Sequence, residues 1–201
     1  MLVGIGGGIL SDNKDDIRLR DVVVSKPTAT FRGVVQFDQG KILPNKQFER
    51  TRTLKKPPAV LMANVQRLVA QHRRIGNQIP HYLSEMLEIF PNIKEEYICL
   101  GIEHDQLFEA TYNHEGRKNC QWCNQSKVVE HSVRKNSAPR IHYSTIRSAN
   151  EVIKDSVTRD KLRKDLGILC VEMEAASLIN KFFCLVIRGI CDYTDSHKNK
   201  R

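Results

Sequence analysis

The chain has 201 residues, of which 40% are hydrophobic and 27% charged, and its formal charge is +9. A chain of this length can form one domain and bury about 70% of its unfolded surface. It has no apolar run near the ~20 residues that span a bilayer and no recognisable signal peptide, so we expect an intracellular, cytoplasmic protein without membrane association.

The first predicted elements are strands. Leu2–Ile5 is apolar and leads into glycines 6–8, which predicts a buried strand followed by a glycine turn. Residues 21–25 and 33–37 are rich in valine and are predicted strands, with Asp38-Gln39-Gly40 as a hairpin turn signal.

Two helices and a polar segment are expected next. Leucines and valines recur at helical spacing from residue 57 to 75, and the prolines at 57 and 58 suit a helix start. A second amphipathic helix is predicted over 82–90, where Pro91 stops it. Residues 93–139 are polar and weakly periodic, which predicts an insertion rather than part of the core.

The last third of the chain alternates between strands and helices. The expected elements are a strand at 141–146, a helix that Ser156 or Thr158 caps and Gly167 ends, a strand at 168–172, a helix at 173–181 and a strand at 183–187. Such alternation predicts one α/β domain over residues 1–201, with a largely parallel or mixed sheet.

Six cysteines raise the question of disulfides or metal. Four of them lie in or beside apolar runs, where reduced cysteine acts as a small hydrophobe: Cys99, Cys170, Cys184 and Cys191. His114, Cys120, Cys123 and His131 are zinc-binding residue types, but a single C-x-x-C is a weak signal. We therefore expect a reduced protein without a metal, whose insertion is held by packing of Trp122. Zinc bound by the four residues is the alternative.

The positive charge is spread in short groups of lysine and arginine, and only 6% of the residues are aromatic. No recognition-helix or RNA-binding signature accompanies these groups. The pattern favours a solvated basic surface over a specific nucleic-acid interface.

The apolar run at residues 169–176, LCVEMEAA, contains Glu172 and Glu174 on either side of Met173. A buried carboxylate is costly unless it is paired or hydrogen-bonded. We expect Glu172 to end a strand and Glu174 to lie in the first turn of the next helix, where either could accept hydrogen bonds from a hydroxylated ligand. Pairing with backbone amides or an arginine is an equal alternative.

With the following strand end, IRGICD at 187–192, the segment VEMEAA resembles the nucleoside phosphorylase and nucleosidase superfamily. DIRLRDVVVS, GVVQFDQGK, IHYSTIRSANEVIKD and RGICDYTDSHKNKR resemble the phosphorylase-like domain of fungal multidomain proteins that also carry nucleotide-binding and repeat domains. The resemblance covers nearly the whole chain. It implies a three-layer α/β/α fold around a twisted mixed sheet.

The resemblance also implies a chemistry, the cleavage of a purine N-glycosidic bond with phosphate or water as co-substrate and without a cofactor. Asp192 would protonate or hydrogen-bond N7 of the departing purine, a role that typically contributes 10²–10⁴-fold to the rate. Glu174 would accept hydrogen bonds from the ribose hydroxyls, with Met173 packed on the sugar. Glu172 would mainly shape the pocket.

Four further residues match ligand-contacting positions of the family. Gly7 lies in the glycine run, where a backbone N–H can approach an anion or hydroxyl closely. Ser148 lies on the loop that leads to the base, and the backbone of Ile153, with Val152 beside it, would contact the base edge.

The chain departs from the family at Arg20, Ser144 and Ala149, where the family usually has glycine. Family segments expected before Leu2 and after Arg201 are not in the sequence, so we expect a domain trimmed at both ends, with little turnover. The alternatives are a non-catalytic nucleoside-sensing or interaction module and a basic nucleic-acid binder. The expected partner is a purine nucleoside or nucleotide, and the sequence leaves a homo-oligomer open.

Overall fold

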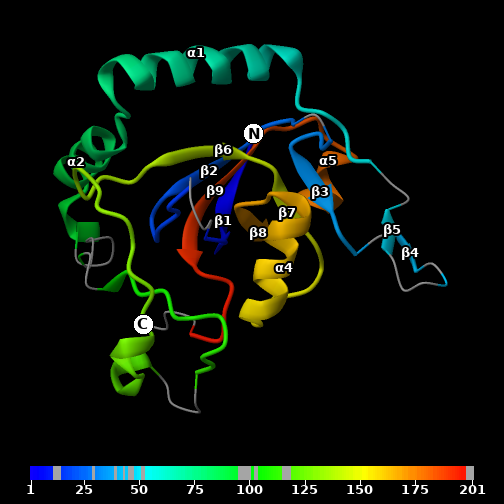
Figure 1. Cartoon of the computed structure of the whole chain (residues 1–201). Coiled ribbons are helices and arrows are strands. Elements are labelled where there is room, and N and C mark those ends of the chain that lie inside the picture. The colour runs from blue at the N-terminus through cyan, green and yellow to red at the C-terminus, as the bar shows by residue number, and fades with distance from the viewer. Residues whose placement is uncertain are drawn as a thin grey trace.

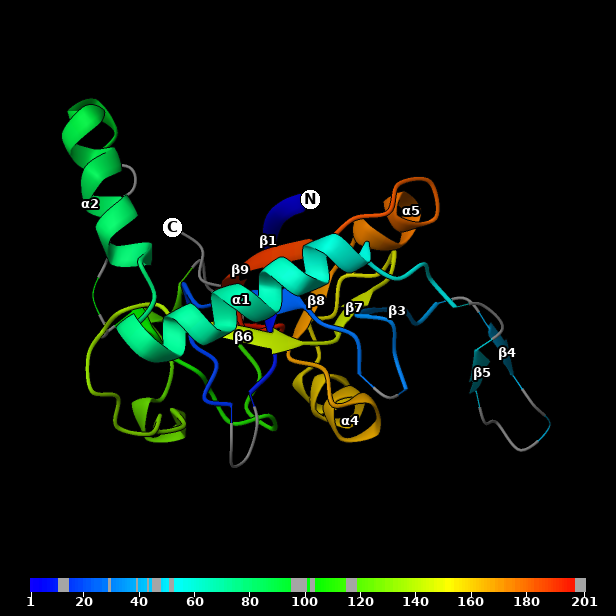
Figure 2. The ribbon, with the colours of Figure 1, turned by 90° about the horizontal axis from the view of Figure 1, so that it is seen from above.

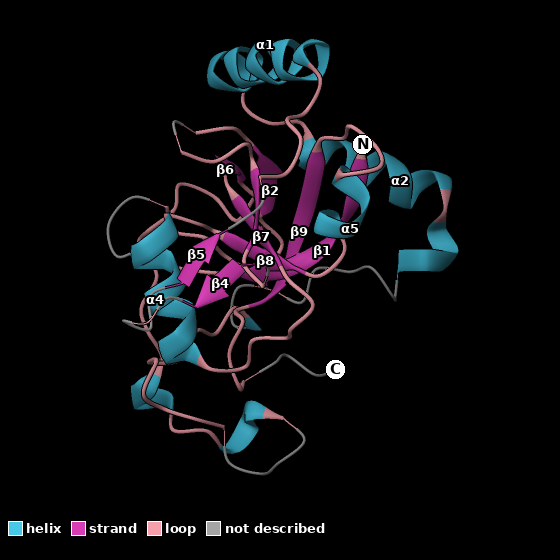
Figure 3. Ribbon diagram, turned by 90° about the vertical axis from the view of Figure 1, so that its right-hand side faces the viewer, coloured by secondary structure: helices cyan, strands magenta, loops and turns pink. Residues whose placement is uncertain are grey.

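A computed structural model describes residues 1–197 except 11–14, 29, 39, 43, 45–47, 51–52, 95–100, 102–103 and 115–118. The strands form the centre of the molecule and the helices lie around them (Figures 1 and 3). Among the described residues, no helix combines the length and apolarity needed to cross a lipid bilayer.

Within the described part of the chain, the main sheet has seven strands and is mixed. Its order is β3 (Val34–Gln36), β7 (Ile146–Ser148), β8 (Cys170–Glu172), β1 (Leu2–Gly8), β9 (Val186–Asp192), β2 (Val22–Ser25) and β6 (Ile141–Ser144). The β3–β7, β7–β8, β1–β9 and β2–β6 pairs are parallel, whereas β1–β8 and β2–β9 are antiparallel. The predicted α/β class with a mixed sheet is confirmed.

The sheet curls on itself. The predicted strand at 141–146 divides at the buried Thr145 into β6, at one edge of the sheet, and β7, next to the other edge. Because consecutive Cα atoms are only about 3.8 Å apart, a single residue between the two strands forces these regions to approach each other. Strands distant in sheet order are thereby brought around one interior.

The helices pack on different parts of the sheet. The helix α1 (Ala59–Ile75) begins after Pro58, as predicted, and its buried Val65 packs with Val24 of β2 and Leu185. The helix α4 (Ser156–Leu166) places Leu162 against the cluster that includes Val35 of β3. The helix α5 (Ala175–Ile179) contributes three residues to the largest core cluster.

Helix ends follow the predicted chemistry with one correction. The N-cap of α4 is Asp155, whose carboxylate accepts from the N–H groups of Val157 and Thr158, and not Ser156 or Thr158. A carboxylate provides two acceptor oxygens, so one side chain satisfies both amides. Gly167 ends this helix at a φ of 62°, as predicted.

The remaining elements lie toward the periphery. They are the helix α2 (Ile79–Ile89), the strands β4 (Gly40–Ile42) and β5 (Phe48–Arg50), and the 3₁₀ turns η1 (Pro91–Ile93), η3 (Cys120–Trp122) and η4 (Gln125–Lys127). The β4–β5 pair stands away from the main sheet (Figures 1 and 2). The hairpin predicted around residues 38–40 is wrong, because β3 before this turn pairs with β7 and β4 after it pairs with β5; Gln39 of the turn lies outside the described residues.

The glycine run is also different from the prediction. Residues 6–8 do not form a turn but continue β1, and all three are buried. A Cβ at Gly6 would lie 2.7 Å from both Cys170 Sγ and the carbonyl oxygen of Val171. Glycine is therefore required in this strand for close contact with β8.

Two elements near the C-terminus shift from their predicted bounds. The last strand starts at Val186 instead of 183 and continues to Asp192, because Phe183 is exposed rather than paired in the sheet. The predicted helix at 173–181 is reduced to α5, so Glu174 precedes its first turn.

The segment 93–139 contributes to the interior despite its polar composition. Leu107 and Phe108 are each 2% exposed, and Phe108 forms an isolated β-bridge with Val128. Arg134 of the same segment forms ion pairs with Asp16 and Asp21, at 3.2 and 2.6 Å. This segment is thus anchored to the residues that precede β2.

Candidate active site

The strand registers bring residues from four strands together. Ser148 of β7 is the partner of Glu172 of β8, and Gly7 of β1 is the partner of both Val171 of β8 and Asp192 of β9. Neighbouring strands lie about 4.8 Å apart. Gly7 therefore separates the strand that carries Asp192 from the strand that leads into Glu172.

A buried arginine answers why two carboxylates flank Met173. The guanidinium Nη2 of Arg188 lies 2.5 Å from Oε2 of Glu172 and 3.1 Å from Oε2 of Glu174, and the residue is 1% exposed. Arg188 is the register partner of Gly4, and a Cβ at Gly4 would lie 2.5 Å from its Nη1. The side chain thus reaches β8 across a strand whose glycine leaves room for it.

The carboxylate of Glu172 is occupied by contacts within the protein. Its carboxylate also accepts hydrogen bonds from the backbone N–H groups of Glu174 and Ala175, at 3.0 and 2.9 Å. Burial opposes ionisation of this group, but hydrogen bonds with Ser148 and Arg188 outweigh burial and lower its pKa. Glu172 is therefore an internal anion that joins β8, α5 and β9.

Glu174 and Met173, in contrast to Glu172, are exposed to solvent. The side chain of Glu174 is 61% exposed although one of its oxygens contacts Arg188, and Met173 is 41% exposed. The two glutamates consequently differ in role. One carboxylate is internal, and the other presents an oriented negative charge at the surface.

Asp192 lies at the end of β9, where the strand pairing shifts by one residue between Gly6 and Gly7. Its Oδ1 accepts a hydrogen bond of 2.8 Å from the N–H of Thr194, which has a φ of 56°. A Cβ at Gly7 would lie 2.1 Å from Thr194 Oγ1 and 2.8 Å from Asp192 Oδ1. Glycine at position 7 therefore allows Asp192 and the following turn to pack on β1.

The residues expected to meet the base occupy different environments. Ser148 is completely buried, and its Oγ accepts a hydrogen bond of 2.9 Å from the N–H of Ala176. Val152 is 51% exposed, whereas Ile153 is partly buried against the cluster that contains Ile9 and Val35. Ser148 therefore stabilises the start of α5 through this hydrogen bond, whereas Val152 exposes an apolar side chain.

Of the three departures from the glycine pattern, only one involves a left-handed backbone among the described residues. Arg20 has a φ of 75°, whereas neither Ser144 nor Ala149 has a positive φ. A non-glycine residue in this region is uncommon and strained. A side chain at position 20 thus has a conformational cost.

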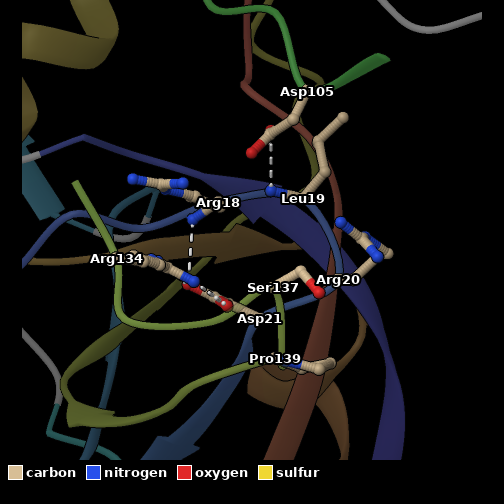
Figure 4. Close-up of a pocket in the computed structure, with 8 residues that line it drawn as sticks. All are labelled: Arg18, Leu19, Arg20, Asp21, Asp105, Arg134, Ser137 and Pro139. Atoms are coloured by element: carbon tan, nitrogen blue, oxygen red, sulfur yellow. Dashed lines mark hydrogen bonds and ion pairs between the residues drawn. The ribbon is translucent and has the colours of Figure 1, made fainter. Parts of the chain in front are cut away.

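Arg20 also lines a small pocket between the segment before β2 and the segment 93–139 (Figure 4). Its other lining residues are Arg18, Leu19, Asp21, Asp105, Arg134, Ser137 and Pro139. The pocket volume of about 10 Å³ holds no more than one water molecule. The carboxylate of Asp21 accepts hydrogen bonds from the side chain of Arg134 and from the N–H groups of Arg18 and Arg140. Its oxygens are therefore occupied by partners within the protein.

The zinc-type residues are only partly brought together. Ligand atoms of His114, Cys120 and Cys123 lie within 4.8 Å of one another. His131 is elsewhere, with its Nδ1 2.8 Å from Asp16 Oδ1 and its Nε2 3.0 Å from the hydroxyl of Tyr193. The expectation that Trp122 packing holds this segment is wrong, because Trp122 is 73% exposed.

Comparison with known proteins places this geometry in context. No model of a known protein family matches the chain. A protein of Hyaloscypha variabilis described as a nucleotide-binding leucine-rich repeat (NLR)-like protein is 41% identical over all 201 residues, which make up 19% of its length. The chain therefore corresponds to about a fifth of that relative.

Among solved structures, the 5'-methylthioadenosine/S-adenosylhomocysteine nucleosidase of Neisseria meningitidis, in complex with methylthio-immucillin-A, superposes with a TM-score of 0.50. The identity is 12%, and the match covers 98% of this chain and 58% of that protein. The corresponding Helicobacter pylori enzyme matches with a TM-score of 0.47 and 14% identity, over 97% and 55% of the two chains. The likeness to the Neisseria protein shows that the chain has the α/β fold of these nucleosidases.

Proposed function

We propose that the chain binds a purine nucleoside beside the ends of β1, β8 and β9 and cleaves its N-glycosidic bond. The observation that carries this proposal is the placement of two carboxylates around a glycine strand. Gly7 pairs with Asp192 on one side, and the strand on its other side leads to the exposed Glu174 beside the buried Arg188. The shared fold with a nucleosidase supports the same interpretation.

The proposed chemistry assigns each carboxylate one task. Glu174 accepts hydrogen bonds from ribose hydroxyls, while Arg188, 3.1 Å from one of its oxygens, holds the carboxylate in place. As the C–N bond breaks, its electron pair goes to the purine and Asp192 transfers a proton to N7. Water or hydrogen phosphate then attacks the ribosyl carbon and releases a proton that restores the acid form of Asp192. The general acid contributes about 10²–10⁴-fold.

The surrounding residues shape the site. Met173 and Val152 are 41% and 51% exposed and offer apolar surface to the sugar and the base. Ser148 and Glu172 act as positioning residues, because both bond to backbone N–H groups at the start of α5.

The proposal predicts that the two carboxylates affect binding and catalysis separately. Glu174→Ala should lower the affinity for adenosine at least tenfold and leave adenine affinity unchanged, because only the nucleoside carries a ribose. Asp192→Asn should retain adenosine binding within about threefold and lower adenine release by 10²-fold or more, since an amide keeps the Thr194 hydrogen bond but is not an acid.

Isothermal titration calorimetry with adenosine and adenine measures the affinities, and chromatography of released adenine, with and without phosphate, measures turnover. Glu85→Ala, which removes an exposed carboxylate from α2, is the matched control and should change neither quantity. Equal losses for adenosine and adenine in Glu174→Ala would contradict the assigned ribose contact.

A second candidate is a nucleoside-sensing module without turnover. It is favoured by the 41% identity to a segment of an NLR-like protein that spans only 19% of that protein. This alternative predicts adenosine binding by the wild-type chain with no adenine release. In that case Asp192→Asn would leave every measured quantity unchanged, whereas Glu174→Ala would still weaken binding.

A further inference from the structure

A cluster of thiols and imidazoles lies where the segment 93–139 meets the residues that follow β9. Cys120 and Cys123 are held in one tight turn, in which Asn119 accepts from the N–H of Gln121 and the N–H of Cys123 bonds to the carbonyl of Cys120. A ligand atom of His114 completes a group whose members lie within 4.8 Å of one another.

His197 faces the two sulfur atoms from the C-terminal segment. Its Nδ1 lies 3.8 Å from Cys120 Sγ and 3.7 Å from Cys123 Sγ. Bonds of about 2.3 Å to sulfur and 2.0 Å to nitrogen at a tetrahedral angle imply a separation of about 3.5 Å between such atoms. The observed separations thus agree with two thiolates and one imidazole that share a tetrahedral ion.

The hydrogen bond of His197 suits a metal ligand. Its Nε2 lies 2.8 Å from the carbonyl oxygen of Tyr112, so this nitrogen carries the hydrogen and donates it. In a neutral imidazole the other nitrogen, Nδ1, then has a lone pair, and this lone pair faces the thiols. Histidines that bind metals usually donate their second N–H to a carbonyl or carboxylate in this way.

Neighbouring side chains hold the two histidines of the cluster in place. His197 is 5% exposed, and its ring stacks on the rings of Phe108 and Tyr112, with centroid distances of 4.1 and 5.3 Å. The N–H of His114 donates to Ser196 Oγ at 2.9 Å, which ties the loop that carries this ligand to the segment that carries His197. Two chain segments about 80 residues apart are therefore held next to each other at the thiol and imidazole cluster.

We propose that His114, Cys120, Cys123 and His197 form a tetrahedral Zn²⁺ site. Two thiolates and two imidazoles at this spacing are the donor set of structural zinc sites, and thiolate ligands select zinc over magnesium or calcium. On binding, each thiol releases its proton to solvent and donates an electron pair to the metal.

The zinc site would have a structural task. It joins the segment 93–139 to the chain just after β9, and His197 is five residues beyond Asp192. The ion would therefore fix the turn that follows Asp192, independently of whether a nucleoside is cleaved. A closed set of four protein ligands leaves no open position for a catalytic water.

The test is metal content and cobalt spectroscopy on the 201-residue chain. After removal of metal under reducing conditions, the wild-type chain should bind one equivalent of Zn²⁺. With Co²⁺ it should show the visible bands of a tetrahedral centre and a thiolate-to-cobalt charge-transfer band. The double variant Cys120→Ser/Cys123→Ser should lose both the zinc and the charge-transfer band, and His197→Ala should weaken zinc binding at least 100-fold.

Two controls match these changes. Cys191→Ala and His81→Ala remove an exposed cysteine and an exposed histidine outside the cluster and should keep one equivalent of zinc. Circular dichroism identifies any variant that fails to fold, and the cobalt spectrum of the wild-type chain needs no variant. Absence of tetrahedral cobalt bands in the reduced wild-type chain would overturn the proposal, as would a Cys120–Cys123 disulfide that persists under these conditions.

Discussion

At the scale of single residues, Arg188 organises the candidate site although it is hidden from solvent. It satisfies the internal Glu172 and also contacts the exposed Glu174, so one cation serves a structural and a surface carboxylate. A buried ion pair gives little net stability compared with apolar packing, but removal of one partner leaves an uncompensated charge. This arrangement explains why an apolar run can contain two glutamates.

Arg188→Met should therefore destabilise the chain by about 3–5 kcal/mol, because Glu172 would remain buried without its cation. The double variant Arg188→Met/Glu172→Gln should recover a large part of this loss, since a neutral amide oxygen can still accept from the N–H of Ala175. Urea unfolding gives both values. Arg73→Met on the exposed surface of α1 is the control, with an expected change below about 0.5 kcal/mol. Equal losses for the two arginine variants would contradict the role of the pair.

At the scale of elements, the sequence predicts helix ends that depend on a single nearby proline or glycine. The helix start behind Pro58 and the helix end at Gly167 could be predicted because proline and glycine restrict or permit specific backbone angles. The sequence did not predict that the glycine run continues β1. Its glycines allow close contact with Cys170 and Arg188, which are far away in sequence.

The candidate site was predictable only where a motif was contiguous. Glu172 and Glu174 were identified from one short run, but no local pattern indicates that Arg188 crosses β1 to reach them. In the same way, the C-x-x-C signal pointed to His131, whereas the imidazole that faces the thiols belongs to His197. Partners more than 70 residues apart are set by the tertiary fold and not by spacing.

The connection between the segment 93–139 and β2 should depend on pH. Burial opposes ionisation of Asp21, but hydrogen bonds from Arg134, His142 and the N–H of Arg140 outweigh it and lower its pKa to about 2. A lowered carboxyl pKa stabilises the fold fully above the unfolded-state value of about 4, and this contribution is lost as the pH falls toward 2. The loss should amount to about 2 kcal/mol.

The measurement is the free energy of unfolding in urea at several pH values between about 5 and 2. Asp21→Asn should reduce the slope in this interval, because Asp21 no longer contributes to the titration while Asp16 and Glu172, whose pKa values are also lowered, still do. Asp165→Asn, which changes an exposed aspartate of α4, serves as the control and should leave the slope as in the wild-type chain. A wild-type slope retained in Asp21→Asn would show that other carboxylates cause the acid sensitivity.

At the scale of the whole molecule, the curled sheet explains how remote segments share one region. Since only Thr145 separates β6 from β7, the sheet cannot remain open, and the strands between them surround a common interior. The buried charges balance across this interior. Among the described residues, four arginines and four acidic residues are buried, namely Arg18, Arg147, Arg159 and Arg188 with Asp21, Asp105, Glu172 and Asp195.

The buried charges of the described residues cancel, so the formal charge of +9 is not taken up by this set and should cause weak, non-specific attraction to polyanions. We expect duplex DNA to bind with a dissociation constant of about 10⁻⁴–10⁻⁶ M, and we expect the affinity to fall steeply with salt, because the contacts are to phosphates. Fluorescence anisotropy with two duplexes of unrelated sequence, over a series of salt concentrations, should give equal affinities and equal slopes. A complex that prefers one duplex and survives ~200 mM salt would instead identify the basic surface as a specific nucleic-acid interface.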